Sequence, residues 1–242
     1  MKIIKLDTIN STNSYLRELA IHQDVDNFTV VSAKHQSEGK GQIDKKWITE
    51  PNKNLTFSIL IKEKYQIQHK KYINIAVSLA LHDWFTQKKI KNLSIKWPND
   101  IMAGSKKLSG ILIETMIRGS KIYHTVIGIG INVNQQQFSS DIKSASSLSL
   151  ESNKTFDLDL LLLEILPIIQ NRIQDFLNGK FKELDKAYSK LLYRKDTPSD
   201  FVDNQGNRFV GSITGISQDG NLLISTENGS VREFGIKEVA FA

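Results

Sequence analysis

The sequence has 242 residues, of which 40% are hydrophobic and 24% charged, a composition that is ordinary for a globular protein and excludes a disordered chain. It has no cysteine, which excludes disulfides and thiol chemistry. Its first residues lack the long apolar region of a signal peptide and no apolar run is long enough to cross a bilayer, so we expect a cytoplasmic protein. The net charge of +6 suits anionic partners, either phosphate-bearing ligands or acidic proteins.

The first candidate binding residues are Ser11, Thr12 and Asn13, which precede a short helical pattern over residues 14–20. Hydroxyl and amide side chains in this place favour capping of a helix N-terminus. The alternative is that they bind a polar group of a ligand together with the exposed backbone amides.

A flexible basic loop follows. Gly39 and Gly41 flank Lys40, Gln36 precedes them, and Trp47 marks the far end of the loop. The two glycines would allow the backbone to fold over phosphate groups. The order of residues is not that of a Walker loop, and a mobile surface loop is the alternative.

Regular structure is predicted on both sides of this loop. Residues 28–33 and 55–62 have the composition or alternation of strands. Residues 73–85 carry apolar side chains at helical spacing, so we expect this helix to cover the sheet.

Two further strands are predicted at residues 94–97 and 107–114, because apolar residues alternate there with small or polar ones. Pro98 cannot donate a hydrogen bond to a sheet and should end the first of them. A short bend between the two strands suggests that they pair as a hairpin.

Charged and amide side chains gather around that bend. Lys96 lies near the end of the first strand, on the face opposite its apolar neighbours. Asn99 and Asp100 lie in the bend, and Lys107 opens the return strand. In a hairpin, Lys107 would come back close to Asp100, and a carboxylate and two amines would share one pocket. The alternative is a surface hairpin with solvated charges.

Residues 124–134 form a strand with two unlike faces. Its alternation places isoleucine and valine on one face, while the other carries Gly128, Gly130, Asn132 and Asn134. Glycine weakens a strand, so its presence here indicates that something approaches the backbone closely. A planar ligand such as a nucleotide base would fit, and a second backbone packed across the glycines is the alternative.

The C-terminal third changes character. Helical patterns from residue 156 to Gly179 and over residues 181–192 give way to short strands, such as 208–216 and 221–226, separated by glycine turns. We predict an α+β fold, with a main domain over residues 1–194 and a small SH3-like β-barrel over residues 195–242.

Together these motifs resemble the biotin protein ligases over nearly the whole chain. The resemblance rests on Ser11-Thr12-Asn13, on Gln36 with the loop at 39–47, on Lys-Trp-Pro-Asn-Asp at 96–100, on Lys-Leu-Ser-Gly-Ile-Leu-Ile-Glu at 107–114 and on the strand at 128–134. It implies a mixed-sheet catalytic domain followed by an SH3-like C-terminal domain. About ten residues precede Ser11, which suggests the form without an N-terminal DNA-binding domain, so operator DNA is not an expected partner.

The resemblance implies a reaction in two steps. The carboxylate of biotin attacks the α-phosphate of ATP, and the resulting biotinyl-5'-AMP acylates a lysine of a biotin carboxyl carrier protein. Lys107 matches the family's essential lysine, which would stabilise negative charge in the first step. Asp100 matches the carboxylate thought to accept the proton of the acceptor lysine. Lys96 completes the expected catalytic set.

The resemblance also implies ligand contacts. Those to biotin are Ser11, Thr12, Asn13, Gln36, Gly39, Lys40, Gly41, Gln42, Lys107 and Gly110. Those to ATP or the adenylate are Lys40, Gln42, Trp47, Asn99, Lys107, Gly130 and Asn132. Biotin and ATP are thus expected as substrates, with Mg²⁺ accompanying ATP and no metal held by the protein itself.

The loop departs from the family pattern, which is rich in arginine. Lys40 and Lys45 keep the charge without the bidentate guanidinium, Gln42 is neutral, and Asp44 stands where glycine is usual. Fewer cations over the phosphate would weaken retention of the adenylate.

Two other functions stay open at this stage. A lipoate ligase or octanoyltransferase shares this fold, although the Lys-Trp-Pro-Asn-Asp motif and the SH3-like tail favour biotin. A basic nucleic-acid-binding module would use the small barrel and the positive charge, although no motif of aromatic and basic residues supports it. The sequence leaves the choice between monomer and homodimer open.

Overall fold

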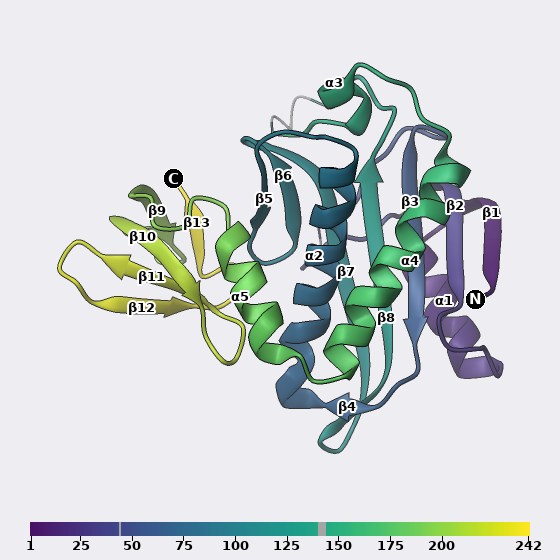
Figure 1. The fold of residues 1–242 in the computed structure, drawn as a ribbon, viewed down its shortest axis with the longest axis horizontal. Coiled ribbons are helices and arrows are strands. Elements are labelled where there is room, and N and C mark those ends of the chain that lie inside the picture. The colour runs from purple at the N-terminus through teal and green to yellow at the C-terminus, as the bar shows by residue number, and fades with distance from the viewer. Residues whose placement is uncertain (44, 140–143) are drawn as a thin grey trace.

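The fold consists of two sheets and the helices that pack against the larger one (Figure 1). The computed structural model describes residues 1–43, 45–139 and 144–242. The departure from the family pattern at Asp44 therefore lies outside the described residues. The larger sheet has eight strands in the order β1-β2-β3-β8-β7-β6-β5, with β4 beside β8, and the smaller has five in the order β12-β11-β10-β9-β13.

The larger sheet is mixed, because β1 runs parallel to β2 while its other pairings are antiparallel. Its strands are β1 (Ile3–Ile9), β2 (Val30–Gln36), β3 (Asn54–Ile61), β4 (Tyr65–Gln66), β5 (Leu93–Lys96), β6 (Asp100–Ala103), β7 (Lys106–Arg118) and β8 (Lys121–Asn132). The smaller, antiparallel sheet contains β9 (Ser199–Asp203), β10 (Arg208–Ile216), β11 (Leu222–Thr226), β12 (Val231–Phe234) and β13 (Val239–Phe241).

The helices are α1 (Thr12–His22), α2 (Lys70–Gln87), α3 (Leu148–Ser152), α4 (Leu158–Leu177) and α5 (Phe181–Leu191), with a 3₁₀ turn at Ile67–His69. In the part of the chain that the structure describes, none of them is long and apolar enough to cross a bilayer.

The helices divide between the two faces of the larger sheet. Ile59 and Ile127 belong to the main core beneath α2 and α4, which lie in front of the sheet in Figure 1. Their neighbours Leu60 and Val126 belong to a smaller cluster with Leu16 of α1. Because successive residues of a strand point to opposite faces, α1 covers the face opposite to α2 and α4. It leaves part of that face open.

The hairpin predicted from residues 94–97 and 107–114 is wrong, because β6 lies between the two strands and pairs with both. The chain turns at residues 97–99, between β5 and β6, as Pro98 predicts, and again at Gly104, between β6 and β7, where a φ of +56° suits glycine. Ile101 and Met102 belong to β6 and are buried, whereas a surface bend would have exposed these apolar side chains. Asp100 consequently begins a strand and lies opposite Lys96 on one side and Gly110 on the other.

The predicted fold class is confirmed, since a mixed-sheet α+β unit is followed by a small antiparallel sheet. The expected turns close on Gly206, Gly220 and Gly229, all with positive φ. The small sheet is anchored to the larger unit by side chains. The indole Nε1 of Trp97 donates to Gly220 O at 2.9 Å, and Lys71 Nζ donates to Ser217 O at 3.1 Å. The boundary at residues 194 and 195 stays a prediction.

Candidate active site

A cavity of about 590 Å³ opens on the uncovered part of the larger sheet. The N-terminus of α1, the loop at 39–47, strands β5 to β8 and the small C-terminal sheet surround it. Most of the residues predicted from the sequence line it: Ser11, Thr12, Asn13, Gln36, Lys40, Gly41, Gln42, Trp47, Lys96, Asn99, Asp100, Lys107, Gly110 and Gly130. Gly39 and Asn132 are not among the lining residues.

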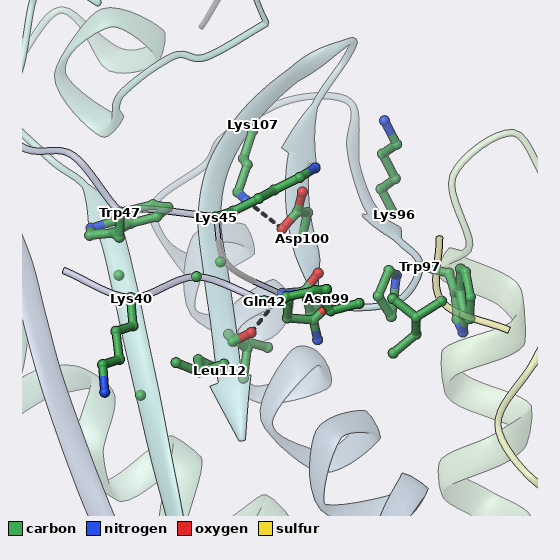
Figure 2. Close-up of a pocket in the computed structure, with 18 of the residues that line it drawn as sticks. Lys40, Gln42, Lys45, Trp47, Lys96, Trp97, Asn99, Asp100, Lys107 and Leu112 are labelled. Atoms are coloured by element: carbon green, nitrogen blue, oxygen red, sulfur yellow. Dashed lines mark hydrogen bonds and ion pairs between the residues drawn. The ribbon is translucent and has the colours of Figure 1, made fainter. Parts of the chain in front are cut away.

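Lys107 and Asp100 form an ion pair at the centre of the cavity (Figure 2). Lys107 Nζ lies 2.6 Å from Asp100 Oδ1. Gly110 gives the lysine its room, because a Cβ there would lie 3.1 Å from Lys107 Nζ. The segment at Ser144 and Ser146 holds the backbone of Lys107. The Lys107 N–H donates to Ser144 O at 2.7 Å, and the Ser146 N–H donates to Lys107 O at 3.0 Å. The convergence predicted from the motif is therefore present, although it arises between β6 and β7.

Lys96 lies on the other side of Asp100, which is its partner across β5 and β6. Burial lowers the pKa of the Lys96 ammonium below its usual range, Asp100 opposes that shift, and Lys107 adds to it. The ammonium lies 5.3 Å from the ring centroid of Phe241, a residue of the small sheet. This cation–π contact partly replaces the water that burial removes.

The loop at 39–47 closes on itself as a tight hairpin. Gly41 N–H donates to Lys45 O at 2.6 Å, and Trp47 N–H donates to Gly39 O at 2.8 Å. Gly39 is buried in this turn, where a Cβ would lie 2.3 Å from Trp47 O. Lys40 and Lys45 are exposed on the hairpin and line the cavity.

The bare face of β8 is covered by side chains of the same chain. The indole of Trp47 lies on Gly130, where a Cβ would come within 2.3 Å of the ring. The amide of Asn13 lies on Gly128 in the same way, at 2.3 Å. The close approach predicted from the two glycines is confirmed, and it is made by side chains, not by the second backbone that was the alternative.

Two amides predicted to contact the adenylate are engaged with backbone. Asn132 is buried and donates to Ser146 O at 3.0 Å and Lys107 O at 3.4 Å, so it supports the segment that holds the lysine. Asn99 donates to Ile111 O at 2.6 Å and accepts from the N–H of Ile111 through its carbonyl. Asn99 lines the cavity, whereas Asn132 lies behind it.

A buried polar cluster forms the end of the cavity beside α1. Ser11 caps the helix by accepting from Ser14 N–H at 3.4 Å, as the capping interpretation predicts. Thr12 donates to Gln36 Oε1 through its backbone N–H at 2.8 Å and through its hydroxyl at 3.0 Å. Thr12 and Gln36, distant in sequence, are thereby fixed against each other.

Sequence reasoning missed the contribution of the small sheet. Ile236, Lys237 and Phe241 line the cavity with Lys46 of the loop. Local patterns predict which face of its own strand a residue occupies, but they carry no information on how one sheet docks against another. The Lys237 side chain adds to a lining in which, among the described residues, six lysines face one aspartate.

Comparison with known proteins places these motifs in a family. Residues 6–132 match the sequence model described as the Biotin/lipoate A/B protein ligase family. The bifunctional ligase/repressor BirA of Bacillus spizizenii is 28% identical over 230 residues, which cover 94% of this chain and 70% of that protein. A biotin–[acetyl-CoA-carboxylase] ligase of Paracoccus denitrificans is 28% identical over 105 residues, 43% of each chain.

Solved structures match the whole fold. The biotin protein ligase of Aquifex aeolicus in complex with biotin and ATP superposes with a TM-score of 0.77 at 28% identity, covering 100% of this chain and 98% of that one. The ligase of Leishmania major in complex with biotinyl-5-AMP has a TM-score of 0.66 at 18% identity, covering 97% and 98% of the chains, and shows a shared fold alone.

Gly130→Ala tests the position of Trp47. A methyl group at Gly130 would overlap the indole ring, so we expect a cost of about 1 to 3 kcal/mol in urea unfolding and increased quenching of tryptophan fluorescence by acrylamide. Gly215→Ala is the control, since a Cβ at this strand glycine meets nothing within 4 Å. Equal effects in the two variants would contradict the indole's placement.

Lys96→Met tests the cost of the buried ammonium. The folded state binds this proton more weakly than the unfolded chain, so charged Lys96 destabilises the fold, and that cost fades as pH rises from the lowered pKa towards 10.5. We expect Lys96→Met to melt higher by roughly 2 °C at pH 7, with a smaller difference at alkaline pH. Lys106 is exposed, so Lys106→Met should melt as wild type does. A rise of the same size in that variant would contradict the assignment of the effect to burial of Lys96.

Proposed function

The chain belongs to the Biotin/lipoate A/B protein ligase family, and from this premise we propose that it activates biotin with ATP as biotinyl-5'-AMP and transfers it to a lysine of a biotin carboxyl carrier protein. The family expected from the motifs is thereby confirmed, and the identity of the acyl group and the acceptor is the proposal. The observation that carries it is the Lys107–Asp100 ion pair inside a cavity whose described lining has six lysines and one aspartate.

The charge of the cavity supports a polyanionic substrate. ATP with its Mg²⁺ brings phosphate oxygens, and lysines on the loop, on β5 and in the turn between β12 and β13 surround the space that they would occupy. The enclosure strengthens each charge interaction, because fewer waters screen it. The similarity to the Aquifex aeolicus ligase, whose structure holds biotin and ATP, supports both substrates.

In the first proposed step, an oxygen of the biotin carboxylate attacks the α-phosphorus of ATP and pyrophosphate leaves. Negative charge gathers between carboxylate and phosphate during this step. The Lys107 ammonium, positioned by the backbone bonds on both sides, would stabilise that charge more in the transition state than in the ground state. Lys96 is paired across β5 and β6 with Asp100, the partner of Lys107, and would contribute a second positive charge.

In the second proposed step, the amine of the carrier lysine attacks the acyl carbon of the adenylate and AMP leaves. The attacking amine must lose a proton, and Asp100 is the carboxylate in the described lining that can receive it. In the free protein Asp100 is occupied by Lys107. When the phosphate draws the Lys107 ammonium towards itself, the carboxylate becomes available to the incoming amine.

The direct test of the function is ATP–pyrophosphate exchange with and without biotin. Exchange that requires biotin supports the proposal. Exchange that requires lipoate instead would show that the protein activates lipoate, the other acid in the family's name. Mass spectrometry of a carrier protein after incubation with ATP and biotin then tests transfer. An unchanged carrier mass would refute the proposed acceptor.

Lys107→Met should lower the rate of biotin-dependent exchange more than a hundredfold, because losing one preorganised charge costs on the order of 3 kcal/mol at such a site. Its neighbour Lys106 is exposed, so Lys106→Met is a matched control that should retain the wild-type rate. Circular dichroism checks that both variants are folded. A folded Lys107→Met protein with near wild-type exchange would remove this lysine from the chemistry.

Asp100→Asn should harm transfer more than activation. The amide cannot accept the proton of the carrier lysine, so we expect a loss of about a hundredfold in the rate at which preformed adenylate acylates the carrier. Exchange with pyrophosphate should fall much less, and single-turnover measurements separate the two rates. Equal losses in both half-reactions would refute this division of roles.

A further inference from the structure

The aromatic ring of Phe241, at the end of β13, has a fixed place beside the end of β5. It packs against the ring of Phe201, which is 1% exposed, with 4.9 Å between the ring centroids. It also contacts Tyr193 edge to face, with 5.6 Å between the centroids. The N–H of Tyr193 donates to Ile95 O at 2.9 Å, so this second ring is tied to the residue next to Lys96. Contacts from two separate segments therefore fix the ring of Phe241.

Two cations lie over this ring. Lys96 Nζ is 5.3 Å and Arg194 Cζ is 5.7 Å from its centroid. Both distances are within the roughly 6 Å over which the face of an aromatic ring attracts a cation. Arg194 is exposed, whereas Lys96 and Phe241 line the cavity. The ring thus acts on one cation of the cavity, the ammonium of Lys96.

Asp100 is the alternative partner of that ammonium. Lys96 and Asp100 are opposite each other in the antiparallel pairing of β5 and β6, so their Cβ atoms are about 5 Å apart on one face and the lysine can reach the carboxylate. Among the described residues, however, the ion pair of Asp100 is with Lys107 alone. In Figure 2 the Lys96 ammonium points away from the Asp100 carboxylate. The ring has the ammonium of Lys96, and the carboxylate has that of Lys107.

A second ammonium on Asp100 would hinder the proposed transfer step. In that step the carboxylate accepts a proton from the carrier lysine. Each neighbouring cation favours the ionised form of a carboxylate and makes it a weaker proton acceptor. The phosphate of the adenylate would also have to draw away two ammonium groups instead of one before the amine could approach.

We propose that Phe241 is a positioning residue, which holds the Lys96 ammonium away from Asp100 so that the carboxylate has a single cation to release before it accepts the proton. The proposal rests on the transfer step proposed above. It gives a residue of the small sheet a task in that step, which the residue performs through Lys96.

The experiment is a double-mutant cycle with four proteins: wild type, Phe241→Leu, Lys96→Met and the variant with both substitutions. Leucine fills part of the space of the ring but has no aromatic face, and methionine keeps the length of lysine without its charge. The rate measured is the single-turnover transfer from preformed biotinyl-5'-AMP to the carrier protein. Such a cycle isolates the part of an effect that passes through the second residue.

Phe241→Leu should slow transfer about tenfold, because a cation–π contact that is partly shielded from water holds an ammonium by about that factor. The same substitution in the Lys96→Met protein should change the rate by less than about twofold, since no ammonium is left to approach Asp100. Phe209→Leu is a control in the same sheet, where the ring lies 4.5 Å from the guanidinium of Arg232. It should transfer at the wild-type rate.

A structural role for Phe241 would slow transfer equally with and without the charge of Lys96, and that result would overturn the proposal. Where Phe241→Leu does not fold, Phe241 is replaced by trifluorophenylalanine, which keeps the shape of the ring and weakens its attraction for cations. This protein should transfer as slowly as we expect of the leucine variant. A rate near that of wild type would overturn the proposal.

Nuclear magnetic resonance of lysine labelled at Cε tests the contact without any activity. The ring should move the Cε proton signal of Lys96 upfield in wild type, and the signal is identified by its absence in Lys96→Met. No upfield signal in active wild-type enzyme would refute the proposal and leave the proposed function intact. An upfield signal without biotin-dependent exchange would refute the proposed function and the role in transfer, but not the contact of Phe241 with Lys96.

Discussion

The site depends on three glycines that lie together on one face of the larger sheet. Gly110 and Gly130 are paired across β7 and β8, and Gly128 lies two residues away on the same face. Into this hollow project the ammonium of Lys107, the indole of Trp47 and the amide of Asn13, which come from three separate segments. A methyl group at any of the three glycines would meet one of these groups at 3.3 Å or less. Close packing onto bare backbone thus aligns the groups.

The same hollow concentrates positive charge at a cost to the fold. Lysines from the loop, from two strands and from the small sheet share one lining, and burial already lowers the pKa of Lys96. The Lys107–Asp100 pair offsets part of this repulsion in the free protein. An anionic ligand would relieve the rest, so the charge that destabilises the empty site is the charge that would bind phosphate. The same lysines would therefore lower the stability of the fold and favour the binding of an anion.

Sequence periodicity predicted the strands that carry the site but not how they meet. The alternation in β8 identified the glycine face, because the period of a strand is fixed by its backbone. It could not show that Asn132 lies beneath the segment at Ser146, or that Asp100 begins a strand instead of lying in a bend. The contribution of Phe241 was beyond prediction for a related reason. Its position depends on how the two sheets dock, and docking between sheets produces no periodic pattern in the sequence.

The cavity joins residues as distant as Ser11 and Phe241. During synthesis, all the strands of the larger sheet, which lie within residues 3–132, leave the ribosome before Phe241, the residue whose ring lies beside Lys96. The cavity is therefore complete only when the last strand has docked, and contacts of such long sequence separation form slowly. A chain that stops short of Phe241 would lack the aromatic ring beside Lys96 and part of the cavity lining.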